Sequence, residues 1–260
     1  MNNPRKYGSK PYNIALIHGG PGAPGEMAPL AQKLSDDFGI IEPIQTANTI
    51  EGQIEELHNI LVNYGNPPVY LIGHSWGAWL VYIYAALYSA LMEKIILISS
   101  GPFKEKDSQN IMPTRLNRLT NKEKSKLSTI QKELTNPFTG NKSYLFKQLG
   151  ELLSKADTFD PLTSKSFVIE YQPDIFQSIW NEASELRKSG KLIRFGKRIK
   201  CPVVAIHGDY DPHPAEGVKI PLSETLDKFK FILLKKCGHY PWNEKNAFYE
   251  FYQILREEIR

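Results

Sequence analysis

The chain has 260 residues, of which 41% are hydrophobic and 23% are charged, and its formal net charge is +4. This composition excludes a disordered chain, and the length suits one large α/β domain or a core domain that carries an insertion. A charge this small indicates no nucleic-acid or membrane partner, since either would need basic residues gathered on one face. The lysines between Lys104 and Lys155 are instead mixed with acidic residues, which is typical of a solvated surface.

The sequence also bears on where the protein acts in the cell and on whether it forms disulfides. No run approaches the roughly 20 apolar residues that a membrane-spanning helix needs. Residues 1–12 are polar and lack the apolar centre of a signal peptide. The two cysteines, Cys201 and Cys237, are too few for a disulfide framework, and we expect free thiols. These observations predict a soluble cytoplasmic protein.

Short apolar runs recur along the chain, and helical patterns separate most of them. Such runs are typical of strands buried on both faces of a parallel sheet. We expect six strands, at residues 14–18, 40–44, 69–72, 94–99, 202–207 and 230–234. The expected helices cover residues 27–38, 50–64, 76–89, 222–229 and 246–259. Strands alternating with helices predict an α/β fold with a doubly wound, mostly parallel sheet of about six strands.

One interval, residues 102–198, breaks this alternation because it contains only helical patterns. Thr120 and Glu123 have the spacing of a capping box ahead of an apolar helix face. Further along, Asp174 is placed to cap a helix that has Gly190 just past its end. We predict a helical cap inserted into a core domain formed by residues 1–101 and 199–260. The alternative is that the interval belongs to the core itself.

The stretch Gly73-His74-Ser75-Trp76-Gly77 ends an apolar strand and begins an apolar helix. A G-x-S-x-G pattern in this context is typical of a sharp turn that exposes a nucleophilic serine at the carboxyl edge of a sheet. The two glycines leave room for the turn, and the helix amino terminus can stabilise negative charge. The alternative role for Ser75 is an ordinary helix cap.

On these residues the chain resembles the α/β-hydrolase family, over nearly its whole length outside the predicted cap. Family members carry a serine, then an acid, then a histidine along the chain. The resemblance therefore implies that His239, in Gly238-His239 after the last expected strand, is the base that activates Ser75. It implies that Asp211, which follows Gly208 at the family's spacing, is the acid that orients His239. Asp209 is the competing candidate, with a turn-forming role as its alternative.

A metal site is a second interpretation of this last segment. The side chains of His207, Asp209, Asp211 and His213 alternate, so an extended chain would place all four on one side. Gly208 and the proline at position 212 favour a turn instead, and a catalytic role already accounts for Asp211. We therefore expect no metal and no cofactor.

The loop His18-Gly19-Gly20-Pro21-Gly22 follows the first expected strand. Its glycines let backbone N–H groups approach a substrate closely. In the resembled fold this loop supplies one oxyanion donor and the residue after the nucleophile supplies the other. We assign these donors to the N–H groups of Gly20 and Trp76. A plain turn is the alternative for the loop.

Together, the His-Gly-Gly-Pro-Gly loop and the Gly-x-Ser-Trp-Gly turn are most similar to the proline iminopeptidase branch of the family. The resemblance implies acyl transfer from a small ester, amide or short peptide. In that branch carboxylates of the cap bind the substrate's amino group, and Glu170 is the candidate here. A general carboxylesterase remains an alternative. So does a non-hydrolytic lyase, a peroxidase-type enzyme or a ligand receptor, because one fold hosts many functions.

Overall fold

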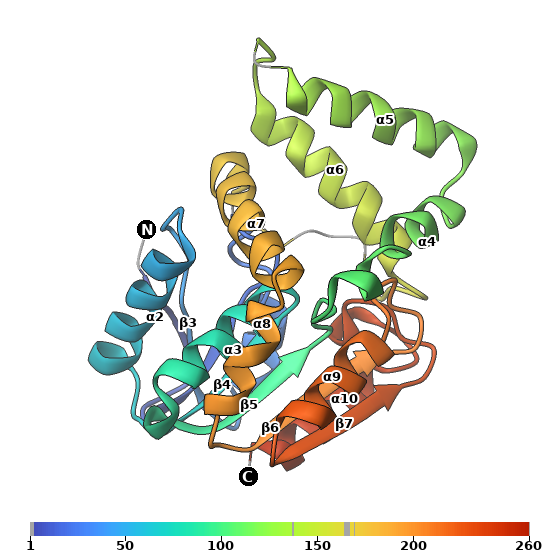
Figure 1. The fold of residues 1–260 in the computed structure, drawn as a ribbon. Coiled ribbons are helices and arrows are strands. Elements are labelled where there is room, and N and C mark those ends of the chain that lie inside the picture. Colours follow the sequence, from blue (N-terminus) through green and yellow to red (C-terminus); the bar gives the residue numbers. More distant parts are fainter. Residues whose placement is uncertain (1–2, 137, 164–166, 169, 260) are drawn as a thin grey trace.

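The computed structural model describes residues 3–136, 138–163, 167–168 and 170–259. Its centre is a seven-stranded sheet in the order β1-β3-β2-β4-β5-β6-β7, in which only β1 is antiparallel to its neighbour (Figure 1). The strands are β1 (Arg5–Tyr7), β2 (Tyr12–Ile17), β3 (Gly39–Glu42), β4 (Val69–His74), β5 (Met92–Ile98), β6 (Val203–Gly208) and β7 (Phe229–Leu234). The prediction of a mostly parallel α/β sheet is confirmed.

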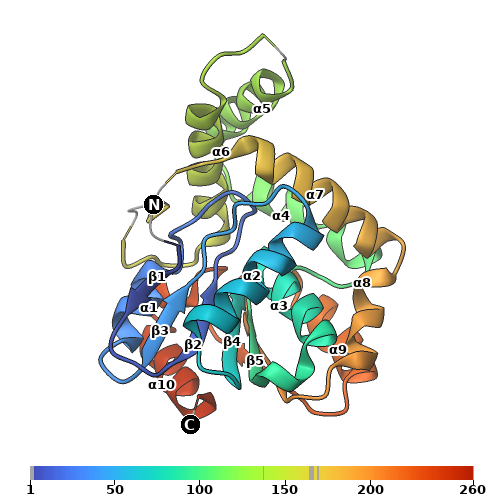
Figure 2. The ribbon, with the colours of Figure 1, turned by 90° about the vertical axis from the view of Figure 1, so that its left-hand side faces the viewer.

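Helices cover both faces of the sheet. Successive residues of a strand point to opposite faces, so each buried strand contributes side chains to two hydrophobic clusters. In β2, Ile14 and Leu16 contribute to one hydrophobic cluster, and Ala15 and Ile17 contribute to the other. The first cluster lies beneath α1 (Ala28–Leu34) and α10 (Phe248–Glu258). The second lies beneath α2 (Ile50–Tyr64), α3 (Trp76–Leu87) and α9 (Glu216–Thr225). Figure 2 shows these helices on the two sides of the sheet.

Three sequence predictions need comment. The sheet has seven strands rather than six, because Arg5–Tyr7 also pairs with β3. The helix expected at residues 222–229 in fact begins at Glu216 and ends at Thr225, while Phe229 begins β7. Both cysteines are buried and free, as expected. Within the described residues, no helix has both the length and the apolar character to cross a bilayer.

The interval between β5 and β6, residues 102–198, is here called the cap. Its described residues form helices and loops and contribute no strand to the sheet. The helices are α4 (Ile111–Asn117), α5 (Asn121–Thr135), α6 (Lys142–Asp157), α7 (Pro173–Lys188) and α8 (Lys191–Arg194). Short 3-10 turns occupy Glu105–Ser108 and Phe195–Arg198 in the cap, and Ser89–Leu91 and Pro241–Asn243 in the core.

The local sequence explains where two cap helices begin. The capping box of Thr120 and Glu123 starts α5, as predicted. The prediction that Asp174 caps α7 is wrong: the N-cap is Gln172, and Asp174 lies inside the first turn. The proline at position 173 suits the first helical position, since its missing N–H would have no partner there.

The two halves of the cap pack differently. Helices α5 and α6 share a small cluster of their own, made by Leu119, Leu127, Ile130, Leu152 and Ala156. Figure 1 shows these two helices projecting away from the sheet. Helices α7 and α8 instead supply Ile179, Ala183 and Leu192 to the main core cluster. The second half of the cap therefore packs as part of the core, and the division into two domains stays a prediction.

Candidate active site

The segments singled out in the sequence all follow parallel strands. Ser75 follows β4, Asp211 follows β6, His239 follows β7, and the glycine-rich loop at residues 18–22 follows β2. Parallel strands present their carboxyl ends at one edge of the sheet. The fold therefore gathers these segments at one rim.

Ser75 occupies a strained turn between β4 and α3. Its φ of 51° and ψ of −113° lie in a region that L-residues rarely adopt. The turn is held by a hydrogen bond from the Ser75 N–H to the Ile98 carbonyl, at 3.0 Å. A Cβ on Gly73 would lie 2.2 Å from the Gly77 carbonyl oxygen, and one on Gly77 would lie 2.4 Å from the Ile17 carbonyl oxygen. Both glycines are therefore required for the backbone to pack this closely.

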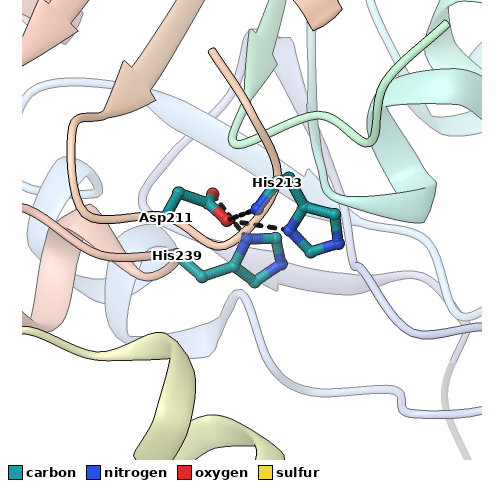
Figure 3. A group of neighbouring side chains, drawn as sticks. All are labelled: Asp211, His213 and His239. Atoms are coloured by element: carbon teal, nitrogen blue, oxygen red, sulfur yellow. Dashed lines mark hydrogen bonds and ion pairs between the residues drawn. The ribbon is translucent and has the colours of Figure 1, made fainter. Parts of the chain in front are cut away.

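Asp211 and His239 form a buried pair. Asp211 Oδ2 lies 2.7 Å from His239 Nδ1, and their side chains are 0% and 4% exposed (Figure 3). A carboxylate can only accept a hydrogen bond, so His239 carries its proton on Nδ1. In the neutral ring this leaves the lone pair on Nε2, which is the form a general base needs.

Two further histidines surround the same carboxylate. His213 donates to Asp211 Oδ1 through its backbone N–H at 2.9 Å and its Nδ1 at 2.8 Å. His207 Nε2 lies 3.6 Å from Oδ2 and 2.8 Å from the His213 carbonyl oxygen. Burial alone would raise the pKa of Asp211, but its interactions with His239, His213 and His207 outweigh burial. They hold the pKa of Asp211 well below its usual range, so the carboxylate stays ionised.

This geometry bears on the possible metal site and on Asp209, the competing candidate for the catalytic acid. Asp211, His213 and His239 place possible ligand atoms within 4.8 Å of one another. Hydrogen bonds between the two rings and the carboxylate already account for this proximity (Figure 3). Asp209 is exposed, and its Oδ1 accepts from the Cys237 N–H at 3.4 Å. It therefore lies outside the histidine cluster, in a turn-stabilising position.

The predicted oxyanion donors lie on two neighbouring segments. Trp76 is the first residue of α3, so its backbone N–H has no acceptor within the helix. Gly20 has a φ of +32°, and its carbonyl accepts from the Ala23 N–H in a tight turn. The loop lies directly against the nucleophile, because a Cβ on Gly19 would be 3.0 Å from Ser75 Cβ. These positions are compatible with the predicted oxyanion hole.

The Ser75 turn and the His239 loop are connected through the side chain of His74. Among the described residues, the Ser75 hydroxyl forms no hydrogen bond. The preceding residue, His74, instead places its Nε2 2.9 Å from the His239 carbonyl oxygen, and the two rings are 4.7 Å apart. The Ser75 turn and the His239 loop are thus neighbours, and the hydrogen bond between their side chains stays a prediction.

Sequence patterns gave no signal for the residues that join the cap to this rim. The Asp157 carbonyl, at the end of α6, accepts from the His239 N–H at 2.8 Å. The Asp157 carboxylate is held by Arg115 of α4 in a two-bond pair of 2.7 and 2.6 Å. On the other side, the Gln172 N–H donates to the Gly22 carbonyl at 2.8 Å. The cap therefore touches both the base loop and the glycine-rich loop.

Glu170, the predicted substrate contact, is exposed and forms no ion pair within the described part of the chain. Its neighbour Ile169 lies outside the described residues. The role of Glu170 therefore stays a prediction.

Comparisons with known proteins agree with this arrangement. Residues 12–244 match the family model described as the alpha/beta hydrolase fold. A proline iminopeptidase of Thermoplasma volcanium is 23% identical, over 95% of this chain and 88% of the relative. A second, from Saccharolobus solfataricus, is also 23% identical, over 95% of this chain and 84% of its own length.

Solved structures show the same fold. VinJ superimposes with a TM-score of 0.69 at 17% identity, covering 98% of this chain and 93% of VinJ. A structure from a study of carboxylesterases of the ammonia-oxidizing thaumarchaeon Nitrososphaera gives a TM-score of 0.66 at 20% identity, covering 98% and 92% of the two chains. The family model spans most of the sequence, and the sheet order, the strained serine turn and the buried aspartate–histidine pair accompany it. The chain belongs to the α/β-hydrolase fold family.

Proposed function

We propose that the protein is a serine hydrolase that cleaves a small ester or amide through an acyl-enzyme on Ser75. The observation that carries this proposal is the buried pair of Asp211 and His239, beside a serine held in a strained strand-to-helix turn. A serine hydroxyl is a weak nucleophile and needs a positioned base. Esterases, lipases and proline iminopeptidases are among the proteins this chain resembles.

Each step of the reaction has an assigned group. Ser75 Oγ attacks the substrate carbonyl while His239 Nε2 accepts its proton, and Asp211 stabilises the resulting imidazolium. The N–H groups of Gly20 and Trp76 bind the oxyanion, and each such donor typically contributes about 100- to 1,000-fold in rate. His239 then protonates the leaving group, and water attacks the acyl-enzyme with His239 again acting as base.

The charges near the rim favour an uncharged substrate. An aminopeptidase needs a buried carboxylate that is free to meet the substrate's ammonium group. In the described residues, Asp157 is paired with Arg115, Glu182 accepts from the Ile50 N–H, and Asp160 is paired with Lys245. Asp174 and Glu170 are exposed. Because none of these carboxylates is both buried and free, a small neutral ester is the substrate class we propose first.

A fluorophosphonate probe tests the nucleophile. The wild-type protein should label and should hydrolyse p-nitrophenyl acetate, and Ser75→Ala should lose both properties. Asp211→Asn should lower kcat by about 10,000-fold, because the histidine loses the acceptor that fixes its tautomer. Asp209→Asn is the matched control and should keep nearly full activity. Labelling that survives in Ser75→Ala, or equal losses in the two aspartate variants, would refute the proposed roles.

The second candidate is an aminopeptidase of the proline iminopeptidase type, favoured by the curated relatives. Rates on L-proline β-naphthylamide and on its N-acetylated form separate the two candidates. A strong preference for the free amine that Glu170→Gln abolishes would establish amine recognition by the cap. Turnover of the acetylated compound and of simple esters without such a preference would establish the esterase.

A further inference from the structure

Glu26 and His74 form a second, largely buried pair beside the proposed triad. Glu26 follows the glycine-rich loop, and His74 is the last residue of β4, directly before Ser75. Glu26 Oε2 lies 2.9 Å from His74 Nδ1, and the same oxygen accepts from the Gly19 N–H at 2.9 Å. The side chains of His74 and Glu26 are 1% and 16% exposed. The mechanism proposed above assigns neither residue a role.

The partners of His74 determine where its protons lie. Its Nε2 lies 2.9 Å from the His239 carbonyl oxygen, which can only accept, so Nε2 carries a proton. Its Nδ1 faces the Glu26 carboxyl group. Burial would raise the pKa of Glu26, but the charge of His74 and its hydrogen bond outweigh burial and lower that pKa. An ionised Glu26 also only accepts, so this arrangement calls for a donor N–H at each of the two His74 nitrogens.

This pair connects three separate segments of the rim. Through Glu26 it binds the peptide N–H of Gly19, next to the predicted donor Gly20. Through His74 it binds the backbone of the His239 loop. The packing is tight: a Cβ on Gly19 would lie 2.6 Å from Glu26 Oε2 and 2.7 Å from His74 Nδ1. The rings of His74 and Trp242 are nearly perpendicular to each other, with their centroids 4.7 Å apart.

We propose that Glu26 and His74 are positioning residues, a buried ion pair that holds the oxyanion loop and the base loop in one fixed arrangement around Ser75. This inference rests on the proposed serine hydrolase function. The pair touches backbone groups rather than substrate, so it acts on the geometry of the transition state. Misplacing a catalytic group by about 1 Å can cost about 100-fold in rate. Its loss should therefore lower kcat more than it raises KM.

Nuclear magnetic resonance of the histidine side-chain nitrogens tests the pair without relying on activity. The chain has six histidines, and the His74 signals are identified by their absence in His74→Asn. At pH 7.5 both His74 nitrogens should carry a proton in the wild-type protein. In Glu26→Gln the carboxylate charge is gone, and His74 should become neutral. A neutral His74 in the wild-type protein would overturn the ion pair.

Kinetics of Glu26→Gln on p-nitrophenyl acetate test the positioning role. The glutamine oxygen can still accept from the Gly19 N–H, but a neutral His74 can donate to only one of its two partners. We expect kcat to fall about 10- to 100-fold with KM nearly unchanged. Glu258→Gln is the matched control, because Glu258 pairs with Lys94 and Lys230 at the opposite edge of the sheet. It should leave kcat unchanged.

These outcomes separate the two proposals. Wild-type protein that neither labels with fluorophosphonate nor turns over ester would end the hydrolase proposal, while the protonation state of His74 would still be measurable. Active wild-type protein with an unchanged kcat in Glu26→Gln would end only the positioning role. Thermal unfolding of Glu26→Gln checks that the variant is folded under the assay conditions.

Discussion

The rim of the sheet and the α5–α6 half of the cap are organised in opposite ways. At the rim, the proposed catalytic groups are fixed by contacts with distant segments, as Asp211 is by His239 and the His239 backbone is by Asp157 and His74. Helices α5 and α6 pack around a small cluster of four of their own side chains and Leu119, and they carry many exposed lysines. The contrast suggests that the chemistry depends on the core, whereas the cap can change with the substrate at little cost to the fold.

The largest expected effect is the loss of stability when a glycine at the rim is replaced, compared with a glycine in the α5–α6 half of the cap. A Cβ on Gly77 would meet the backbone oxygens of Ile17 and His18 at 2.4 and 2.5 Å, whereas one on Gly140 would meet nothing within 4 Å. We expect Gly77→Ala to lower the free energy of unfolding by about 3 kcal/mol, since backbone cannot move aside cheaply. Gly140→Ala should change it by less than about 0.5 kcal/mol. Urea unfolding measures both, and similar losses would contradict the contrast.

The same contrast explains what the sequence could predict. The buried strands were recognisable because residues covered on both faces form continuous apolar runs, as in Ile95–Ile98 of β5. The strand β1 was missed because Arg5, Lys6 and Tyr7 have no such pattern, and only the partner β3 makes them a strand. The start of α9 was misjudged because Pro221 lies inside the helix and is normally a sign of its end.

The residues of the candidate site also differ in how far the sequence alone could reveal them. Ser75, Asp211 and His239 were singled out because each belongs to a local motif with a recognisable spacing. Glu26 belongs to no such motif, and the sequence pattern offered His213 only as a possible metal ligand, so contacts in space are needed to show what both residues do. Asp157 acts on His239 through a backbone carbonyl, which no side-chain pattern records. Pocket specificity was beyond prediction because cap packing depends on long-range contacts.

Disrupting the join between the cap and the rim should have an effect of comparable size. The Arg115–Asp157 pair is buried, with side chains 14% and 3% exposed. Asp157→Asn leaves the guanidinium without its counter-charge, and we expect a loss of about 3 kcal/mol in the free energy of unfolding. Turnover should also fall, because Asp157 supports the His239 loop. Asp160→Asn, which removes an exposed pair with Lys245, is the control and should cost less than about 1 kcal/mol.

The pH dependence of stability should single out the histidine cluster of the rim. The pKa of Asp211 is held well below its usual range, chiefly by His239 and His213 acting against burial. The unfolded chain therefore binds this proton more readily than the folded one. The stabilisation is fully present above the unfolded pKa of about 4 and is lost as the pH falls through the folded value. Urea unfolding measures the free energy of unfolding at pH 7 and at pH 3. This free energy should be higher for the wild-type protein than for Asp211→Asn at pH 7, and the difference should be smaller at pH 3. A margin that widens in acid would contradict this sign.

The smallest expected effect lies at the start of α5. Thr120 Oγ1 accepts from the Glu123 N–H, and the Glu123 carboxylate accepts from the Thr120 N–H. Thr120→Ala should cost about 1 kcal/mol, because the helix loses one side of its capping box. Since α5 packs against α6 rather than the rim, hydrogen exchange should rise in α5 while turnover of p-nitrophenyl acetate stays unchanged. Thr135→Ala, at the other end of the helix, is the control. A loss of turnover in Thr120→Ala comparable to that in Asp157→Asn would mean that α5 and α6 shape the site directly, and the contrast between rim and cap would fail.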